Sequence, residues 1–198
     1  MKKVLLLLAA VVAMGAAVPA VAQQKKTVKK TVAKKAPAKK GVQKKAVQAV
    51  APLDISDGEF LTNGKAAMLG IPVKQPNAAV EAALKGKGFK FDANISCWKG
   101  SAHGVSVGIF IDDTNQMTCR ELKGWTKQQA FKRFQSYCKQ ITAVTGALPD
   151  SYPTDMSVEG VMVTLKGDGA VYIVSCQNED EVDFSSKYFN ILVTVRQE

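Results

Sequence analysis

The order of apolar and polar residues after residue 53 changes period several times, and each change predicts a new element. Val80, Ala83 and Leu84 recur at the spacing of one helical face. Pro76 suits the first turn of that helix, and Gly86 suits its end. The pattern therefore predicts a short helix with one apolar side.

A second and longer helix is predicted after Thr126. Thr126 suits the N-cap, and Gln129 stands three residues later, which makes a capping box. Gly146 and Pro149 end the pattern. The residues that recur at spacings of three and four, and form one buried stripe, are Ala130, Phe134, Tyr137, Ile141 and Val144.

Alternation with a period of two predicts strands around both helices. Residues 105–111 are the clearest case, because every second residue is Val or Ile. Gly167-Asp168-Gly169 is typical of a hairpin turn between two further strands. The predicted strands are residues 88–92, 95–99, 105–111, 117–122, 158–165, 170–176 and 188–195.

These elements come in an order of one helix followed by three or four strands, twice. Antiparallel hairpins with both helices on one face of the sheet form a two-layer sandwich. We therefore predict an α+β fold in a single domain over residues 53–198, a normal size for one domain.

A short stretch resembles a known family. Met68-Leu69-Gly70-Ile71-Pro72-Val73, followed by a helix and by Lys87-Gly88-Phe89, is similar to the start of a family of uncharacterised secreted bacterial proteins. The resemblance implies a tandem-repeat fold like that of the β-lactamase inhibitor protein, and it implies protein binding. No inhibitory residue of that protein matches a position in this chain.

The first 22 residues have the pattern of an export signal. Lys2 and Lys3 precede an apolar run over residues 4–13, and Ala20-Val21-Ala22 has the small residues of a signal peptidase site. The run is shorter than the roughly 20 residues that a membrane span needs. We expect cleavage before Gln23 and a periplasmic or secreted bacterial protein; the alternative is an uncleaved anchor.

Residues 23–52 form a lysine-rich tail without an acidic residue. Pairs of lysines recur in a loose five-residue repeat, which places them around a helix axis rather than on one face. With little to bury, the tail is predicted to be disordered. Its ten lysines are Lys25, Lys26, Lys29, Lys30, Lys34, Lys35, Lys39, Lys40, Lys44 and Lys45.

The net charge of +10 belongs to this N-terminal part. Twelve of the 27 Lys and Arg lie before residue 52, so 15 basic residues face all 17 acidic ones in the remainder. Phosphate neutralisation by such a tail carries no base readout, and the export signal disfavours nucleic acid as a specific partner. The expected partner is an anionic lipid or polymer of the cell envelope; the alternative is a solubilising spacer.

His103 is the single histidine and the candidate base for a hydrolase. Cys97 or Ser101 would be its nucleophile, and Asp112 would orient the ring. The alternative is structural, because a tight turn tolerates His in a left-handed conformation and Gly104 follows it.

The four cysteines contain no C-x-x-C motif, which disfavours zinc ribbons and thioredoxin-type chemistry. Cys97 and Cys119 lie two strands apart in the predicted meander, which is too far for a disulfide. Cys138 and Cys176 are the preferred pair for an exported chain; the alternative is four buried thiols.

No metal site or cofactor is predicted. The acidic residues in 178–183 lack the ligand spacing of an EF-hand and are expected to be a solvated loop. Trp98 is a candidate protein contact if it lies on the side of the sheet that the helices leave free. The leading hypothesis is a secreted, non-enzymatic binding domain for a protein or peptide. The alternatives are the hydrolase and a structural envelope protein.

Overall fold

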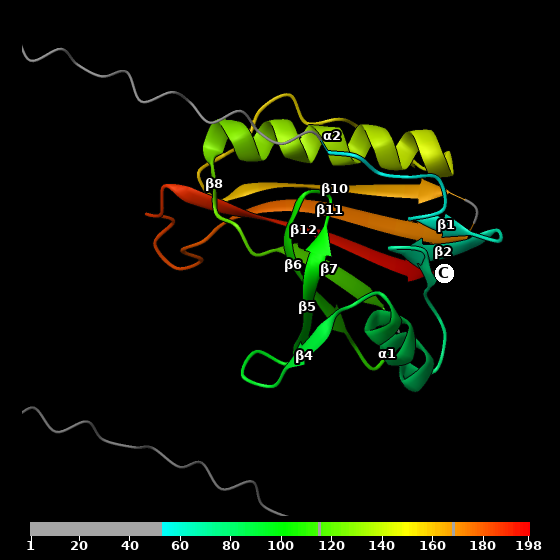
Figure 1. Cartoon of the computed structure of the whole chain (residues 1–198). Coiled ribbons are helices and arrows are strands. Elements are labelled where there is room, and N and C mark those ends of the chain that lie inside the picture. Colours follow the sequence, from blue (N-terminus) through cyan, green and yellow to red (C-terminus); the bar gives the residue numbers. More distant parts are fainter. Residues whose placement is uncertain (1–52, 115, 168) are drawn as a thin grey trace, which may run out of the picture. The chain divides into compact units, whose positions relative to one another are not determined.

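The structure is a computed structural model of the chain, and it describes residues 53–114, 116–167 and 169–198 (Figure 1). The predicted signal peptide and lysine tail lie outside the described residues. Of the 36 buried apolar residues of the described part, 33 form one contiguous cluster, so the described residues share a single core.

The predicted α+β sandwich is wrong. The described part has twelve strands in two antiparallel sheets and only two helices, of 10 and 19 residues. It is therefore richer in β structure than a helix-plus-strands unit repeated twice. The sequence pattern led to this error because five of the strands span two residues or four, too short for alternation to be visible.

The smaller sheet contains three strands that the sequence pattern did not predict: β1 (Leu61–Thr62), β2 (Lys65–Met68) and β3 (Ile71–Pro72), in this order. Two-residue loops join them, because Thr62 pairs with Lys65 and Met68 pairs with Ile71. In the second hairpin, the first loop residue, Leu69, has φ of 54°. Glycine is the second loop residue in both hairpins. This is the backbone of the type I′ turn that suits hairpin twist.

The larger sheet has nine strands in the order β4-β5-β6-β7-β12-β11-β10-β9, and β8 pairs with β12 beside β7. The strands are β4 (Lys90–Asp92), β5 (Cys97–Ala102), β6 (Val105–Ile111), β7 (Met117–Glu121), β8 (Trp125–Thr126), β9 (Leu148–Pro149), β10 (Gly160–Gly167), β11 (Ala170–Asn178) and β12 (Tyr188–Gln197). Gly167 pairs with Ala170, which confirms the hairpin predicted there. The meander of β5, β6 and β7 is also confirmed.

Both helices form where the sequence pattern predicts them. Helix α1 (Asn77–Gly86) follows Pro76, and helix α2 (Lys127–Thr145) follows Thr126. The Thr126 amide donates to Gln129 Oε1 at 3.3 Å, which confirms the capping box. Gly146 ends α2 with φ of 72°.

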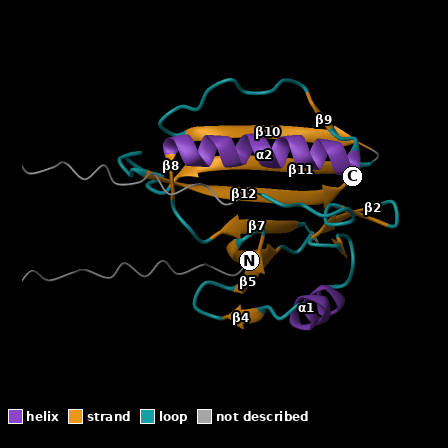
Figure 2. Cartoon of the chain, turned by 45° about the horizontal axis from the view of Figure 1, so that its top comes forward, coloured by secondary structure: helices purple, strands orange, loops and turns teal. Residues whose placement is uncertain are grey.

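The helices and the small sheet pack on one side of the large sheet, which we call the covered face. Strand register places Trp98, Ile109, Cys119 and Val193 in one row on this face. Figure 2 shows α2 lying along β10, β11 and β12, with α1 at the end near β4 and β5. The layers therefore leave the opposite side of the sheet without a helix in the described part of the chain.

Candidate functional site

A buried polar network lies between α2 and the covered face, centred on Glu121 at the end of β7. Glu121 is 1% exposed and Arg133 of α2 is 1% exposed. Arg133 Nε lies 2.6 and 2.7 Å from the two carboxylate oxygens, and Trp125 Nε1 donates to Oε2 at 2.7 Å. Tyr137 donates its hydroxyl to Oε1 at 2.6 Å. The charges are paired and hydrogen-bonded, as buried charges must be.

His103 extends this network towards the surface. Its Nδ1 lies 2.9 Å from the Tyr137 hydroxyl, and its Nε2 lies 3.0 Å from Glu59 Oε2. Because the Tyr137 proton points to Glu121, Nδ1 must donate to the Tyr137 oxygen. Both ring nitrogens are in use, and neither is left for a substrate.

The structure also explains His103 as a turn residue. It has φ of 52° and Gly104 has φ of 74°, in a two-residue loop between Ala102 and Val105. Arg133 donates to the His103 carbonyl at 2.8 Å. Arg133 of α2 and the hydrogen bonds of the His103 ring therefore both hold this loop in place. This is the structural role that the sequence offered as the alternative for His103.

The candidate hydrolase residues are not brought together. Cys97 begins β5 and His103 follows its end, which separates them by roughly 20 Å at about 3.3 Å per residue. Cys97 also points to the face opposite Trp98, whereas His103 reaches Tyr137 on α2. Ser101 is exposed on the same side as Cys97. Asp112 accepts from the amides of Thr114 and Gln116 in the next turn instead.

The four cysteines are buried free thiols, including the preferred pair Cys138 and Cys176, so the structure contains no disulfide between them. Burial raises the pKa of Cys138 to about 12 and, with the nearby Glu121 charge, raises the pKa of Cys176 to about 12. Burial also raises the pKa of Cys97. None has the lowered pKa of a nucleophilic thiol.

Trp98 lies on the covered face and is 6% exposed. Its ring contacts Phe91, with ring centroids 5.3 Å apart, and the Lys85 ammonium of α1 lies 5.3 Å from the ring centroid. Trp98 is therefore a core residue, and the condition for a protein contact is not met.

The acidic loop after β11 uses its carboxylates within the loop. Asp180 accepts from the amides of Val182 and Asp183 at 3.2 and 3.1 Å, and from the Ser185 hydroxyl at 2.5 Å. These hydrogen bonds, the one from Ser185 first, lower the pKa of Asp180. The described residues contain no group of three or more side chains placed to hold a metal ion.

The side of the large sheet opposite the helices, here called the open face, is the candidate interaction surface. Strand register assigns to it Lys90, Asp92, Cys97, Lys99, Ser101, Ser106, Gly108, Phe110, Thr118, Arg120, Met162, Thr164, Lys166, Val171, Ile173, Ser175, Asn190, Leu192, Thr194 and Arg196. Two side-chain contacts confirm the assignment. Thr118 and Thr194 are hydrogen-bonded at 2.9 Å, and Lys99 pairs with Asp92 at 2.7 Å.

The open face is basic although residues 52–198 as a whole are slightly acidic. Its charged members are five cations and one carboxylate, and that carboxylate, Asp92, is paired with Lys99. Lys90, Lys166 and Arg196 are exposed. Such a separation of charge favours an acidic partner over a basic or neutral one.

Several apolar side chains on the open face are partly accessible. Met162 on β10 is 64% exposed, and Ile173 and Leu192 beside it are half-buried. Leu122, just after β7, is 39% exposed and lies near Gly108. Accessible apolar side chains together with exposed cations are a combination found in protein interfaces.

Sequence reasoning missed Glu121 and Arg133 of the buried network, and it did not identify the open face. For the network the signal was present: Met117, Cys119 and Glu121 alternate, so Glu121 points inward, and Arg133 lies on the buried side of α2. For the open face there was no signal, because the face is defined by which strands are neighbours. The predicted tail lysines lie outside the described residues.

No helix among the described residues is long and apolar enough to cross a membrane. Comparison of the chain with protein-family models, with curated proteins and with solved structures finds no match.

Proposed function

We propose that the protein is an exported, non-enzymatic binding protein whose open face binds an acidic surface of a protein or peptide. In this proposal the lysine tail holds the domain near an anionic envelope surface. We also propose that the chain is related to the secreted bacterial family that its sequence resembles. Such a relationship would agree with export and with protein binding.

The observation that supports the proposal best is the open face itself. On the side without helices, the nine-stranded sheet exposes the apolar Met162 and the cations Lys166 and Arg196. Apolar contacts would supply affinity, and the cations would steer an acidic partner and set its orientation. The hydrolase alternative has no such support, because Cys97, Ser101 and His103 are apart.

The open face is tested by titrating the ¹⁵N-labelled chain with poly-L-glutamate and following backbone amide shifts. We expect the largest shifts in the domain at β10, β11 and β12, near Lys166, Ile173 and Arg196. The double variant Lys166→Glu, Arg196→Glu should lose these shifts. The matched control, Lys132→Glu with Lys139→Glu on exposed positions of α2, should keep them. Shifts confined to α2, or equal loss in both variants, would contradict the open face.

The tail is tested separately on vesicles that contain anionic lipid. Each lysine near such a surface contributes about 1 kcal/mol. Replacing the ten tail lysines by glutamine should abolish retention at low salt, and moderate salt should weaken retention of the unchanged chain. Equal retention of the two chains at low salt rules out the tether, whatever the poly-L-glutamate titration shows.

A further inference from the structure

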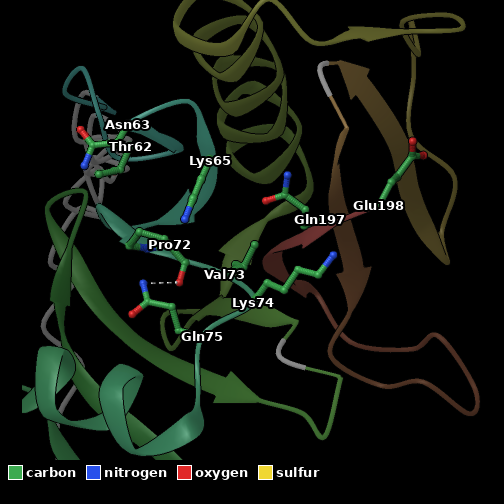
Figure 3. A pocket seen from close by; sticks show the side chains of 9 residues that line it. All are labelled: Thr62, Asn63, Lys65, Pro72, Val73, Lys74, Gln75, Gln197 and Glu198. Atoms are coloured by element: carbon green, nitrogen blue, oxygen red, sulfur yellow. Dashed lines mark hydrogen bonds between the residues drawn. The ribbon is translucent and has the colours of Figure 1, made fainter.

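We propose that a cleft beside the small sheet binds a small hydroxylated molecule that carries one oxyanion, such as an acidic sugar or a sugar phosphate. The cleft has a volume of about 380 Å³ and lies between the β1–β2 hairpin, the segment after β3 and the end of β12 (Figure 3). This volume is in the range of small-molecule sites, roughly 300–1,000 Å³. The cleft lies apart from the open face and does not depend on the proposed function.

Two ammonium groups give the cleft its charge. Lys65 begins β2 and Lys74 follows β3, so the fold brings together cations from different segments. Within the described residues, ion pairs join Lys99 with Asp92 and Arg133 with Glu121, and the Glu59 carboxylate contacts His103. Neither Lys65 nor Lys74 is therefore neutralised by a carboxylate in that part of the chain.

Amide side chains surround the lysines and suit hydroxyl groups. In Figure 3, Lys65 and Gln197 point towards the same space above Pro72 and Val73. Gln75 Nε2 donates to the Pro72 carbonyl at 3.2 Å, which fixes the Gln75 amide at the rim. A primary amide both donates and accepts, as hydroxyl groups do. The combination of ammonium and amide groups matches an oxyanion with neighbouring hydroxyls.

One carboxylate also borders the cleft. Glu198 is among the lining residues, and in Figure 3 its carboxylate lies beyond Gln197, away from Lys65. The lining therefore carries two positive charges and one negative charge. This asymmetry supplies a variant with the opposite effect. Removing the Glu198 carboxylate should strengthen the binding of an anion, whereas removing a lysine should weaken it.

The backbone conformation of Lys74 is a further observation at this cleft. Lys74 has φ of 64°, a conformation that costs free energy for every residue except glycine. Unlike Asn63, Leu69 and His103, which also have positive φ, Lys74 is not followed by glycine. Strain of this kind is found where a side chain must be presented in one direction.

The test is an amide-shift titration of the full ¹⁵N-labelled chain with glucuronate, glucose 6-phosphate and glucose at constant salt. We expect saturable shifts at Asn63, Val73 and Gln197 with glucuronate, with glucose 6-phosphate or with both, and none with neutral glucose. The two charged probes distinguish a carboxylate from a phosphate ligand. No saturable shift in the cleft with either charged probe, or equal shifts with glucose, would overturn the proposal.

Variants connect the shifts to the lysines. Lys65→Gln with Lys74→Gln should weaken binding at least tenfold, and Glu198→Gln should strengthen it. Lys74→Gly should weaken binding while raising the melting temperature, because glycine relieves the backbone at φ of 64°. The control Lys132→Gln with Lys139→Gln on α2 should leave affinity unchanged. A loss of affinity in the control equal to that in the cleft variant contradicts the site.

Discussion

At the scale of single residues, Glu121 is the side chain on which the interior depends most. Its carboxylate accepts from Arg133, Trp125 and Tyr137, and Tyr137 in turn accepts from His103. Four elements, β7, β8, α2 and the β5–β6 turn, thus meet at one charge. Removing that charge takes the Glu121 carboxylate away from the buried Arg133 guanidinium.

We predict that Glu121→Gln lowers the free energy of unfolding by about 3–5 kcal/mol, the cost of breaking a buried pair from one side. Urea unfolding followed by tryptophan fluorescence measures this change. Glu181→Gln, at an exposed position in the acidic loop, is the matched control and should change stability little. A similar small effect of both variants would show that the network contributes little.

The thiols give a second prediction at this scale. All four cysteines are buried, and burial keeps the pKa of Cys138 at about 12, so a thiol reagent should not react with the native chain. In denaturant without reductant, four thiols should react. Two reacting thiols would instead show that one disulfide is present, and the sequence predicts Cys138 and Cys176 as that pair for an exported chain.

At the scale of elements, the segment that follows α1 packs closely against β5. The ring of Phe89, just after α1, lies over Gly100, and a Cβ at Gly100 would come within 2.6 Å of that ring. Phe89 is 5% exposed and belongs to the core cluster. Gly100 is thus required by packing and not by backbone conformation.

The same substitution at two glycines should therefore have opposite effects. Gly100→Ala should destabilise the protein by about 1–3 kcal/mol, the usual cost of overpacking. Gly86→Ala, at the last position of α1 where nothing lies within 4 Å, should stabilise it by about 0.5–1 kcal/mol. Thermal and urea unfolding of both variants measure the difference; destabilisation by both would contradict the role of the Phe89 contact.

The helices were predictable from sequence and several strands were not, for a physical reason that operates at this scale. Helix α2 carries its own signals, a capping box at Thr126 and Gln129 and a terminal Gly146. Strands β1 to β3 are short, and their information lies in the loops, in pairs such as Asn63-Gly64 and Leu69-Gly70. Leucine is not a typical residue for a turn position with positive φ, so Leu69-Gly70 does not indicate a hairpin from sequence. Burial of the Leu69 side chain offsets the cost of this conformation.

At the scale of the whole molecule, the buried thiols should make the fold sensitive to alkali. The pKa of Cys176 is about 12 in the folded chain, raised from an ordinary value near 9.0. The unfolded chain therefore releases this proton at lower pH than the folded chain does. The contribution to stability is complete below pH 9.0 and is lost as the pH rises towards about 12.

We predict that the free energy of unfolding falls with pH above about 9. The double variant Cys138→Ala, Cys176→Ala should show a shallower fall, even though its stability at neutral pH is lower. Urea unfolding at a series of pH values gives both slopes. Identical slopes for the variant and the unchanged chain would show that these thiols do not cause the effect.

Export is the other prediction for the whole molecule. Expressed in a bacterium, the chain should accumulate in the periplasmic or secreted fraction and begin at Gln23. Cell fractionation and intact-mass measurement test both statements. The full mass in the membrane fraction would favour the uncleaved anchor, and the full mass in the cytoplasm would exclude export.

The sequence by itself determined the local features. It determined both helices with their ends, the long strands, the β5–β7 meander, the His103 turn and the concentration of positive charge before residue 52. Each depends on neighbours within a few residues, and the physical chemistry of caps, turns and periodicity is local. The tertiary structure alone decided which residues share the open face, that Glu121 is neutralised by Arg133, and that Lys65 and Lys74 line one cleft. These depend on strand order and on contacts between segments far apart in the chain, and hydrophobic periodicity specifies only which side of each element is buried.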